Sequence, residues 1–217
     1  MVIAMIAMMI GSCGNKNGNQ QTDIADEDTV VAVDLFRDST KYGICGDGSA
    51  MNTLQLLLDS GDTLIVDVSA AQDAGKVFGG YEVGDRMAVM MASDNATAKI
   101  VINQSALLGN WVMPNPIDGS DEIGISIKEG GIAEGIEQSS TIYKTWRIFN
   151  GKLELIAVRE GGGDNEETYL YDLIRLTPDS LIFKDSEDSF EYSRQKANTG
   201  YGVDIVLEEA SEEDYHI

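Results

Sequence analysis

The sequence contains one histidine, two cysteines and three prolines, and these shortages narrow the possible functions. The single histidine, His216, is the next to last residue, which argues against histidine-based catalytic triads and histidine-based metal sites. Basic residues are also scarce: 15 Lys and Arg stand against 37 Asp and Glu, and the net charge is −22. Nucleic acids and anionic membrane surfaces are therefore poor partners. The sequence also has no Gly-x-Ser-x-Gly motif and no EF-hand loop, so we expect no enzyme activity, no cofactor and no metal.

The first 12 residues are apolar and uncharged, and they end in Gly11 and Ser12, directly before Cys13. The run is too short for a membrane span, which needs roughly 20 apolar residues, but it suits the end of a secretory signal. The position of Cys13 resembles the lipobox of bacterial lipoproteins, in which this cysteine is acylated and becomes the first residue of the mature protein. The resemblance implies a signal peptide remnant at 1–12, a palmitate-type lipid on Cys13, and a membrane-anchored location in the cell envelope, at the outer membrane.

Two details of this region leave other interpretations open. The first basic residue is Lys16, although signals normally open with basic residues, so we expect the natural start to lie upstream. A buried apolar strand or helix with an incidental Cys13 is the alternative.

Residues 13–28 are polar, lack aromatic side chains and predict a flexible tether.

Residues 29–104 predict a small N-terminal β domain. Five strand-type runs cover 30–36, 53–58, 63–68, 86–91 and 98–103, separated by Gly, Asp, Asn and Ser. The composition of 49–58 would also suit a helix, but the following turn favours a strand. Five short strands predict a small barrel or a curled sheet. Their order is like that of an oligonucleotide-binding barrel, but the acidic composition argues against nucleic acid.

The segment from Gly43 to Gly48 contains the second cysteine, Cys45, and predicts a turn. If Cys13 carries lipid, Cys45 has no partner for an intramolecular disulfide. No histidine or basic cluster lies near it in the sequence to activate the thiol, so we expect an inert structural cysteine.

Residues 107–195 predict eight sequential strands joined by tight turns, and an acidic tail follows at 196–217. The predicted strands begin at Leu107, Glu122, Gly131, Ile142, Leu153, Thr168, Leu181 and Ser189. Eight strands joined by short hairpins are typical of an up-and-down barrel, whose interior can hold one small ligand. The predicted fold class is therefore all-β, with a small N-terminal barrel or curled sheet followed by an eight-stranded barrel.

Several motifs in the second half point to a known family. Gly109-Asn110-Trp111 resembles the Gly-x-Trp opening of the lipocalin superfamily, and it stands at the head of an eight-strand run that ends in Tyr192-Ser193-Arg194. The spacing of three motifs between them also resembles the lipocalin-like domain of exported lipoproteins in Gram-negative gut anaerobes. These motifs are Tyr143-Lys144-Thr145-Trp146, Gly151-Lys152-Leu153 and Leu176-Thr177-Pro178-Asp179-Ser180-Leu181. Residues 45–103 look like the companion N-terminal segment of such proteins. The resemblance implies a fold and an envelope location, but no established ligand or reaction.

The resemblance also implies a barrel-closing pair, because in lipocalin-like barrels an Arg of the last strand often lies across the Trp of the first strand. Here these residues are Arg194 and Trp111, and closure of the barrel would place their strands side by side. We expect the Arg194 guanidinium within about 6 Å of the Trp111 ring centroid.

Aromatic residues are the candidates for lining a ligand site: Trp146, Tyr171, Phe190 and Tyr192. In the predicted strands Trp146 shares a face with Ile142 and Ile148, and Phe190 lies two residues from Tyr192. Two functions stay open at this point. The barrel binds a small apolar or amphipathic ligand, or it is filled by its own rings and the protein is a non-enzymatic interaction lipoprotein that docks another envelope protein.

Overall fold

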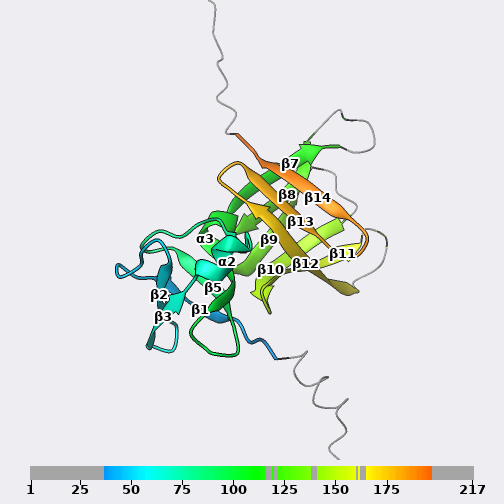
Figure 1. Ribbon diagram of the computed structural model, residues 1–217. Helices are drawn as coiled ribbons and strands as arrows, with labels where there is room; N and C mark the ends of the chain where they lie inside the picture. Colours follow the sequence, from blue (N-terminus) through cyan, green and yellow to red (C-terminus); the bar gives the residue numbers. More distant parts are fainter. Residues whose placement is uncertain are drawn as a thin grey trace, which may run out of the picture. The chain divides into compact units, whose positions relative to one another are not determined.

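The computed structural model describes residues 37–115, 119, 122–137, 141–159, 161 and 165–196 (Figure 1). Cys13, the predicted tether, the predicted strand at 30–36 and residues 197–217 of the predicted tail lie outside these residues. Within the described ranges, no helix has the length and apolar composition needed to cross a membrane.

The first half of the described chain forms a six-stranded sheet with the order β3-β2-β1-β5-β6-β4. Its neighbouring strands are antiparallel except for β4 and β6, which run parallel. The strands are β1 (Lys41–Cys45), β2 (Thr53–Leu58), β3 (Thr63–Asp67), β4 (Val77–Phe78), β5 (Arg86–Met91) and β6 (Ala98–Asn103).

The predicted runs at 53–58, 63–68, 86–91 and 98–103 correspond to β2, β3, β5 and β6. The preference for a strand over a helix in 49–58 was therefore correct for 53–58, and residues 49–52 lie outside the strand. The predicted turn at Gly43–Gly48 was wrong in its first part, because β1 extends through Cys45. Gly43 lies inside this strand for a steric reason: a Cβ there would overlap the backbone carbonyl of Leu57 on β2. A glycine is therefore needed at this position because the two strands lie too close together for a side chain, and it does not mark a turn.

The sheet curls around its own apolar core, which corresponds to the curled sheet of the two predicted alternatives. A parallel bridge joins Asp67, at the end of β3, to Thr97, just before β6, on the far side of the sheet. The short helix α2 (Ser69–Asp73) contacts β6 and contributes Ala71 to the core. Cys45 is buried in this core, and its Sγ lies 3.2 Å from the Ser49 hydroxyl.

The second half forms a closed eight-stranded antiparallel barrel in which each strand pairs with its neighbour in sequence and β14 returns to β7. The helix α3 (Gln104–Leu107) precedes the barrel, and the 3-10 turn η1 (Glu129–Gly131) joins β8 to β9. The strands are β7 (Gly109–Pro114), β8 (Glu122–Lys128), β9 (Ile132–Ile136), β10 (Thr141–Phe149), β11 (Lys152–Arg159), β12 (Glu166–Leu176), β13 (Ser180–Lys184) and β14 (Ser189–Arg194). The predicted fold class is confirmed, and each predicted strand start lies within two residues of an observed one.

In strand β10 of the barrel, the set of side chains that face the interior differs from the prediction. Trp146 and Ile148 face the interior, but Ile142 is exposed. The cause is a bulge between Tyr143 and Thr145 in the pairing of β10 with β11. An extra residue in one strand reverses the alternation beyond it, so the bulge turns Tyr143 inward in place of Ile142.

The sheet and the barrel share one core. Phe78, Ala88 and Ile102 of the sheet belong to the same buried cluster as the barrel side chains. Hydrogen bonds add to this contact: the Tyr42 hydroxyl bonds the carbonyl of Ile148, and the N–H of Gly79 donates to the carbonyl of Leu176 at 3.1 Å. These contacts make the two β structures one compact unit.

Candidate functional site

One end of the barrel is closed around Trp111, which is fully buried on β7. Its indole N–H donates to the carbonyl of Leu107 at 2.7 Å, so the end of α3 is fixed against the ring. The Arg194 guanidinium carbon lies 4.1 Å from the ring centroid. The structure thus brings the predicted pair together, inside the expected 6 Å. Gly109 makes room for it, since a Cβ there would overlap Arg194 Nη1.

Each of the three guanidinium nitrogens of Arg194 also donates a hydrogen bond to a backbone oxygen. Nη1 donates to the carbonyl of Leu108 at 2.8 Å and Nη2 to that of Ala106 at 2.9 Å, while Nε donates to Pro178. A lysine could not satisfy three carbonyls in one plane, because only a guanidinium presents such a fork of donors. This end of the barrel is a structural closure, with Arg194 joining α3, β7 and the β12–β13 turn.

Aromatic rings fill much of the barrel interior. The ring centroids of Tyr171 and Phe183 lie 4.7 Å apart, and those of Phe183 and Tyr192 lie 5.5 Å apart. Phe190 meets Tyr171 edge-on at 5.6 Å. Of the predicted lining residues, Tyr171, Phe190 and Tyr192 are therefore gathered in one cluster. Trp146 lies on β10, and its indole N–H donates to the carbonyl of Lys128 at 2.8 Å.

Burial of the inward-facing residues falls from the closed end of the barrel to the opposite end. On five strands a buried residue is followed, toward the opposite end, by a half-buried one. The buried residues are Trp111, Ile125, Trp146, Tyr171 and Tyr192, and the half-buried ones are Met113, Ile123, Tyr143, Tyr169 and Phe190. We call this half-buried set the mouth layer. It is an apolar layer that carries two phenol groups and remains partly open to solvent.

An ion pair with a tyrosine stands at the rim of the mouth layer. The Arg159 guanidinium donates to the Glu167 carboxylate at 2.9 Å, and the Tyr169 hydroxyl donates to the same carboxylate. The hydrogen bond from Tyr169, with that from Arg159, holds the pKa of Glu167 below its usual value. The rim therefore keeps a fixed carboxylate–guanidinium pair beside the apolar layer.

The interior tyrosines are neutral hydrogen-bonding groups. Burial raises the pKa of Tyr143, Tyr171 and Tyr192 above the ordinary value of 10.0. Neighbouring phenol groups add to the rise in the pKa of Tyr171 and Tyr192, and Asp185 and Asp188 add to the rise for Tyr171. All three hydroxyls consequently remain protonated near neutral pH, where they offer hydrogen bonds inside an apolar surrounding.

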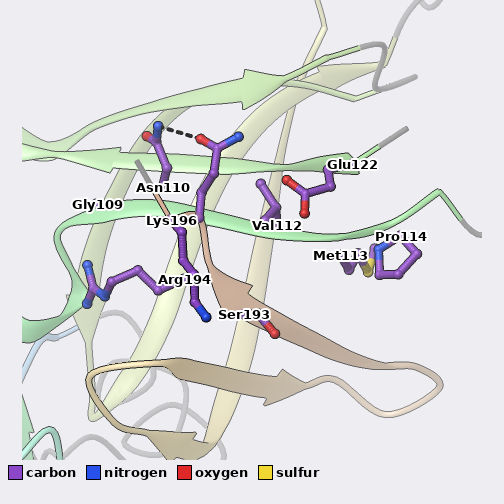
Figure 2. Close-up of a pocket in the computed structure, with 10 residues that line it drawn as sticks. Gly109, Asn110, Val112, Met113, Pro114, Glu122, Ser193, Arg194 and Lys196 are labelled. Atoms are coloured by element: carbon purple, nitrogen blue, oxygen red, sulfur yellow. Dashed lines mark hydrogen bonds between the residues drawn. The ribbon is translucent and has the colours of Figure 1, made fainter. Parts of the chain in front are cut away.

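A groove of about 1040 Å³ follows the outside of the seam between β7 and β14 (Figure 2). These strands pair in register only at Val112–Ser193 and Trp111–Arg194. Figure 2 shows Arg194 turned toward one end of the groove, away from Glu122 at the other. Met113 both lines this groove and packs on the barrel core, so the groove adjoins the mouth layer.

Sequence reasoning missed four of the five mouth-layer residues: Met113, Ile123, Tyr143 and Tyr169. The alternation of Ile123 with Ile125 and of Tyr169 with Tyr171 carried a signal for two of them. Tyr143 had none, because its inward position depends on the bulge of β10.

These features place the second half of the chain in the class of antiparallel up-and-down β-barrels. One end of this barrel is closed by a helix and a Trp–Arg pair, and the other end carries aromatic side chains. The sequence of residues 103–195 matches the Lipocalin-like family, and through this domain the chain belongs to it. The predicted lipocalin-like domain is thereby confirmed.

The chain is similar to a lipocalin-like protein from Bacteroides thetaiotaomicron whose crystal structure is known. The two sequences are 32% identical, and the TM-score between the two structures is 0.38. The similarity covers 42% of this chain and 97% of that one. No curated protein matches the chain. The family assignment rests on the matched residues and the observed topology.

Proposed function

We propose that the protein is a lipid-anchored envelope protein whose barrel binds a small apolar or amphipathic ligand at the mouth layer. The observation that carries the proposal is the fall in burial along five strands toward one end of the barrel. Ligand sites are usually concave and mostly apolar, with a few placed polar groups. The mouth layer has this composition: three apolar side chains and the phenols of Tyr143 and Tyr169.

The ligand chemistry follows from the positions of these groups. An apolar body would contact Met113, Ile123 and Phe190, and a hydroxyl or carbonyl group would bond a tyrosine hydroxyl. The charged rim of Arg159 and Glu167 favours a polar group at the outer end of the ligand. The seam groove beside Met113 adds space for a ligand longer than the mouth layer.

Binding of the neutral fluorescent probe Prodan to the full chain carrying Cys13→Ser tests the proposal. We expect saturable binding with a blue shift of the emission. Ile123→Lys places a charge in the mouth layer and should weaken binding at least tenfold. The matched control, Ile142→Lys, places the same charge on the outer face of β10, where Ile142 is already exposed, and should leave binding unchanged. Absent binding, or equal binding by both variants, would refute the proposal.

The anchor is tested separately. Two or more acyl chains hold a protein stably at a membrane, whereas one chain is marginal, at about 0.8 kcal/mol per buried CH₂. Cys13→Ser should therefore release the protein into the soluble envelope fraction of its host. A variant that still sediments with membranes would show that the lipobox interpretation is wrong.

A second candidate function, docking of another envelope protein, is favoured by an apolar patch on the sheet. Ile44 and Leu57 face each other across β1 and β2, and Ile65 on β3 is 60% exposed. Native mass spectrometry of the protein from its host separates the candidates. A small molecule lost from Ile123→Lys supports ligand binding, and a protein partner lost from Leu57→Lys supports docking.

A further inference from the structure

A second cavity, of about 490 Å³, lies where the sheet meets the barrel. Its walls come from β5, α3, η1 and β10. Of these four elements, only β10 also contributes a residue to the mouth layer. The residues that line this cavity include Arg86, Leu108, Glu129, Trp146 and Arg147. The volume falls in the range of small-molecule sites, about 300–1,000 Å³.

The cavity is notable for its charges. Two of the 15 basic residues of this acidic chain line it, Arg86 from β5 and Arg147 from β10. Each guanidinium is oriented by a carboxylate: Arg86 by Asp59 in a two-pronged ion pair, and Arg147 by Glu154. An arginine has five N–H donors, and each pair uses two of its nitrogens, so donors remain for a ligand.

A carboxylate and an apolar floor complete the lining. Glu129 belongs to η1 and is exposed. Trp146, whose indole N–H is bonded to the carbonyl of Lys128, and Leu108 supply the apolar surface. The cavity therefore offers guanidinium groups for an anion, a carboxylate for a cation, and an indole for an apolar or aromatic group.

The walls are also held in place before any ligand arrives. The backbone N–H of Arg86 donates to the Ser105 hydroxyl at 2.9 Å, which ties β5 to α3. The Gln104 side chain lines the cavity too, and its Nε2 is buried without a hydrogen-bond partner.

We propose that this cavity binds a small zwitterion of the amino-acid type with an aromatic or apolar side group. Its carboxylate pairs with Arg86 and Arg147, its ammonium group with Glu129, and its side group packs on Trp146. This ligand uses every charged group of the lining, whereas a simple anion would leave Glu129 opposed to it. The site is separate from the mouth layer and does not depend on the function proposed there.

Three probes test the proposal by isothermal titration of the full chain carrying Cys13→Ser. They are L-phenylalanine, N-acetyl-L-phenylalanine, which lacks the ammonium group, and L-phenylalaninamide, which lacks the carboxylate. We expect L-phenylalanine to bind at least tenfold more tightly than either analogue. Absence of L-phenylalanine binding up to 10 mM, or equal binding of the N-acetyl analogue, would overturn the proposal.

Variants at exposed positions assign the contacts without disturbing the core. Arg86→Gln should weaken L-phenylalanine at least tenfold, and Glu129→Gln should abolish the preference over the N-acetyl analogue. The matched controls, Arg175→Gln and Glu187→Gln, remove the same charges at exposed positions of β12 and the β13–β14 turn and should have no effect. Ile123→Lys should also have none. Loss of binding in that variant would place the ligand at the mouth layer and overturn the separate site.

Discussion

At the scale of single residues, Arg194 has the most demanding environment in the described structure, since one guanidinium covers an indole and meets three carbonyls. Arg194→Lys keeps the charge but loses the flat stacking and the fork. We expect it to lower the free energy of unfolding by about 2 kcal/mol, measured by urea titration. Arg175→Lys, on the exposed face of β12, is the control and should change stability little. An equal effect of the two would rule out the closure role.

Gly124 makes a second sharp test, because β7 and β8 approach each other at this position. A Cβ on Gly124 would overlap the backbone carbonyl of Trp111, and backbone atoms cannot move aside as a side chain can. Gly124→Ala should therefore destabilise the protein by about 3 kcal/mol in the same titration. Glu122→Ala, at the exposed start of β8, should cost little. A harmless Gly124→Ala would mean that the two strands are not so closely paired.

The resemblance to lipocalin-like barrels predicted the Trp111–Arg194 contact, and residue order supported it, because barrel closure brings the first and last strands together whatever lies between them. It did not predict Tyr143, since a bulge has no clear mark in the local sequence. The alternation of Tyr169 with Tyr171 is visible in the sequence, but it does not indicate how far along the barrel axis burial extends. The extent of burial along the barrel axis depends on where the neighbouring strands end, and the sequence of one strand does not contain this information.

At the scale of elements, the long alternating strands of the barrel were predictable, and short elements were not. β4 has two residues and α3 has four, too few for any periodicity. α3 begins where the Asn103 side chain accepts a hydrogen bond from the N–H of Ala106, a cap that breaks the apolar run toward Leu107. Its closing role depends on contacts with Trp111 that are made only in the folded protein.

The lead into β1 is joined to the β10–β11 hairpin through Asp38. Burial alone would raise the pKa of Asp38, but hydrogen bonds from the Tyr42 hydroxyl and from the N–H groups of Thr40 and Asn150 hold it below 3.8. A carboxyl group whose pKa is lowered by folding stabilises the protein above its unfolded pKa and loses this effect as the pH falls through the folded value.

Asp38→Asn should therefore lower the free energy of unfolding at pH 6, and the difference from the wild type should shrink as the pH falls below 3.8. Urea titrations between pH 3 and pH 6 measure this. Asp47→Asn, in the exposed turn after β1, should leave the stability at pH 6 unchanged. A difference for Asp38→Asn that grows toward low pH would contradict the assigned hydrogen bonds.

At the scale of the whole molecule, the shared core of sheet and barrel predicts that the two unfold together. Both tryptophans, Trp111 and Trp146, lie in the barrel, so their fluorescence reports on it alone. Leu54→Ala in the buried core of the sheet should lower stability by about 3 kcal/mol and shift the fluorescence midpoint by the same amount as the circular dichroism midpoint. Leu57→Ala, on the exposed face, is the control. An unshifted fluorescence midpoint would show independent halves.

The seam between β7 and β14 has a consequence for how the chain reaches its final state in the cell. The closing contacts join residues as far apart as Ala106 and Arg194, 88 positions along the chain. A nascent chain cannot close the barrel until its last strand has been synthesised. Until then β7 and its successive neighbours form an open sheet with two bare edges, which invite pairing with other chains. A stop codon a few residues before Arg194 would therefore leave a chain that cannot close its barrel and is prone to aggregation.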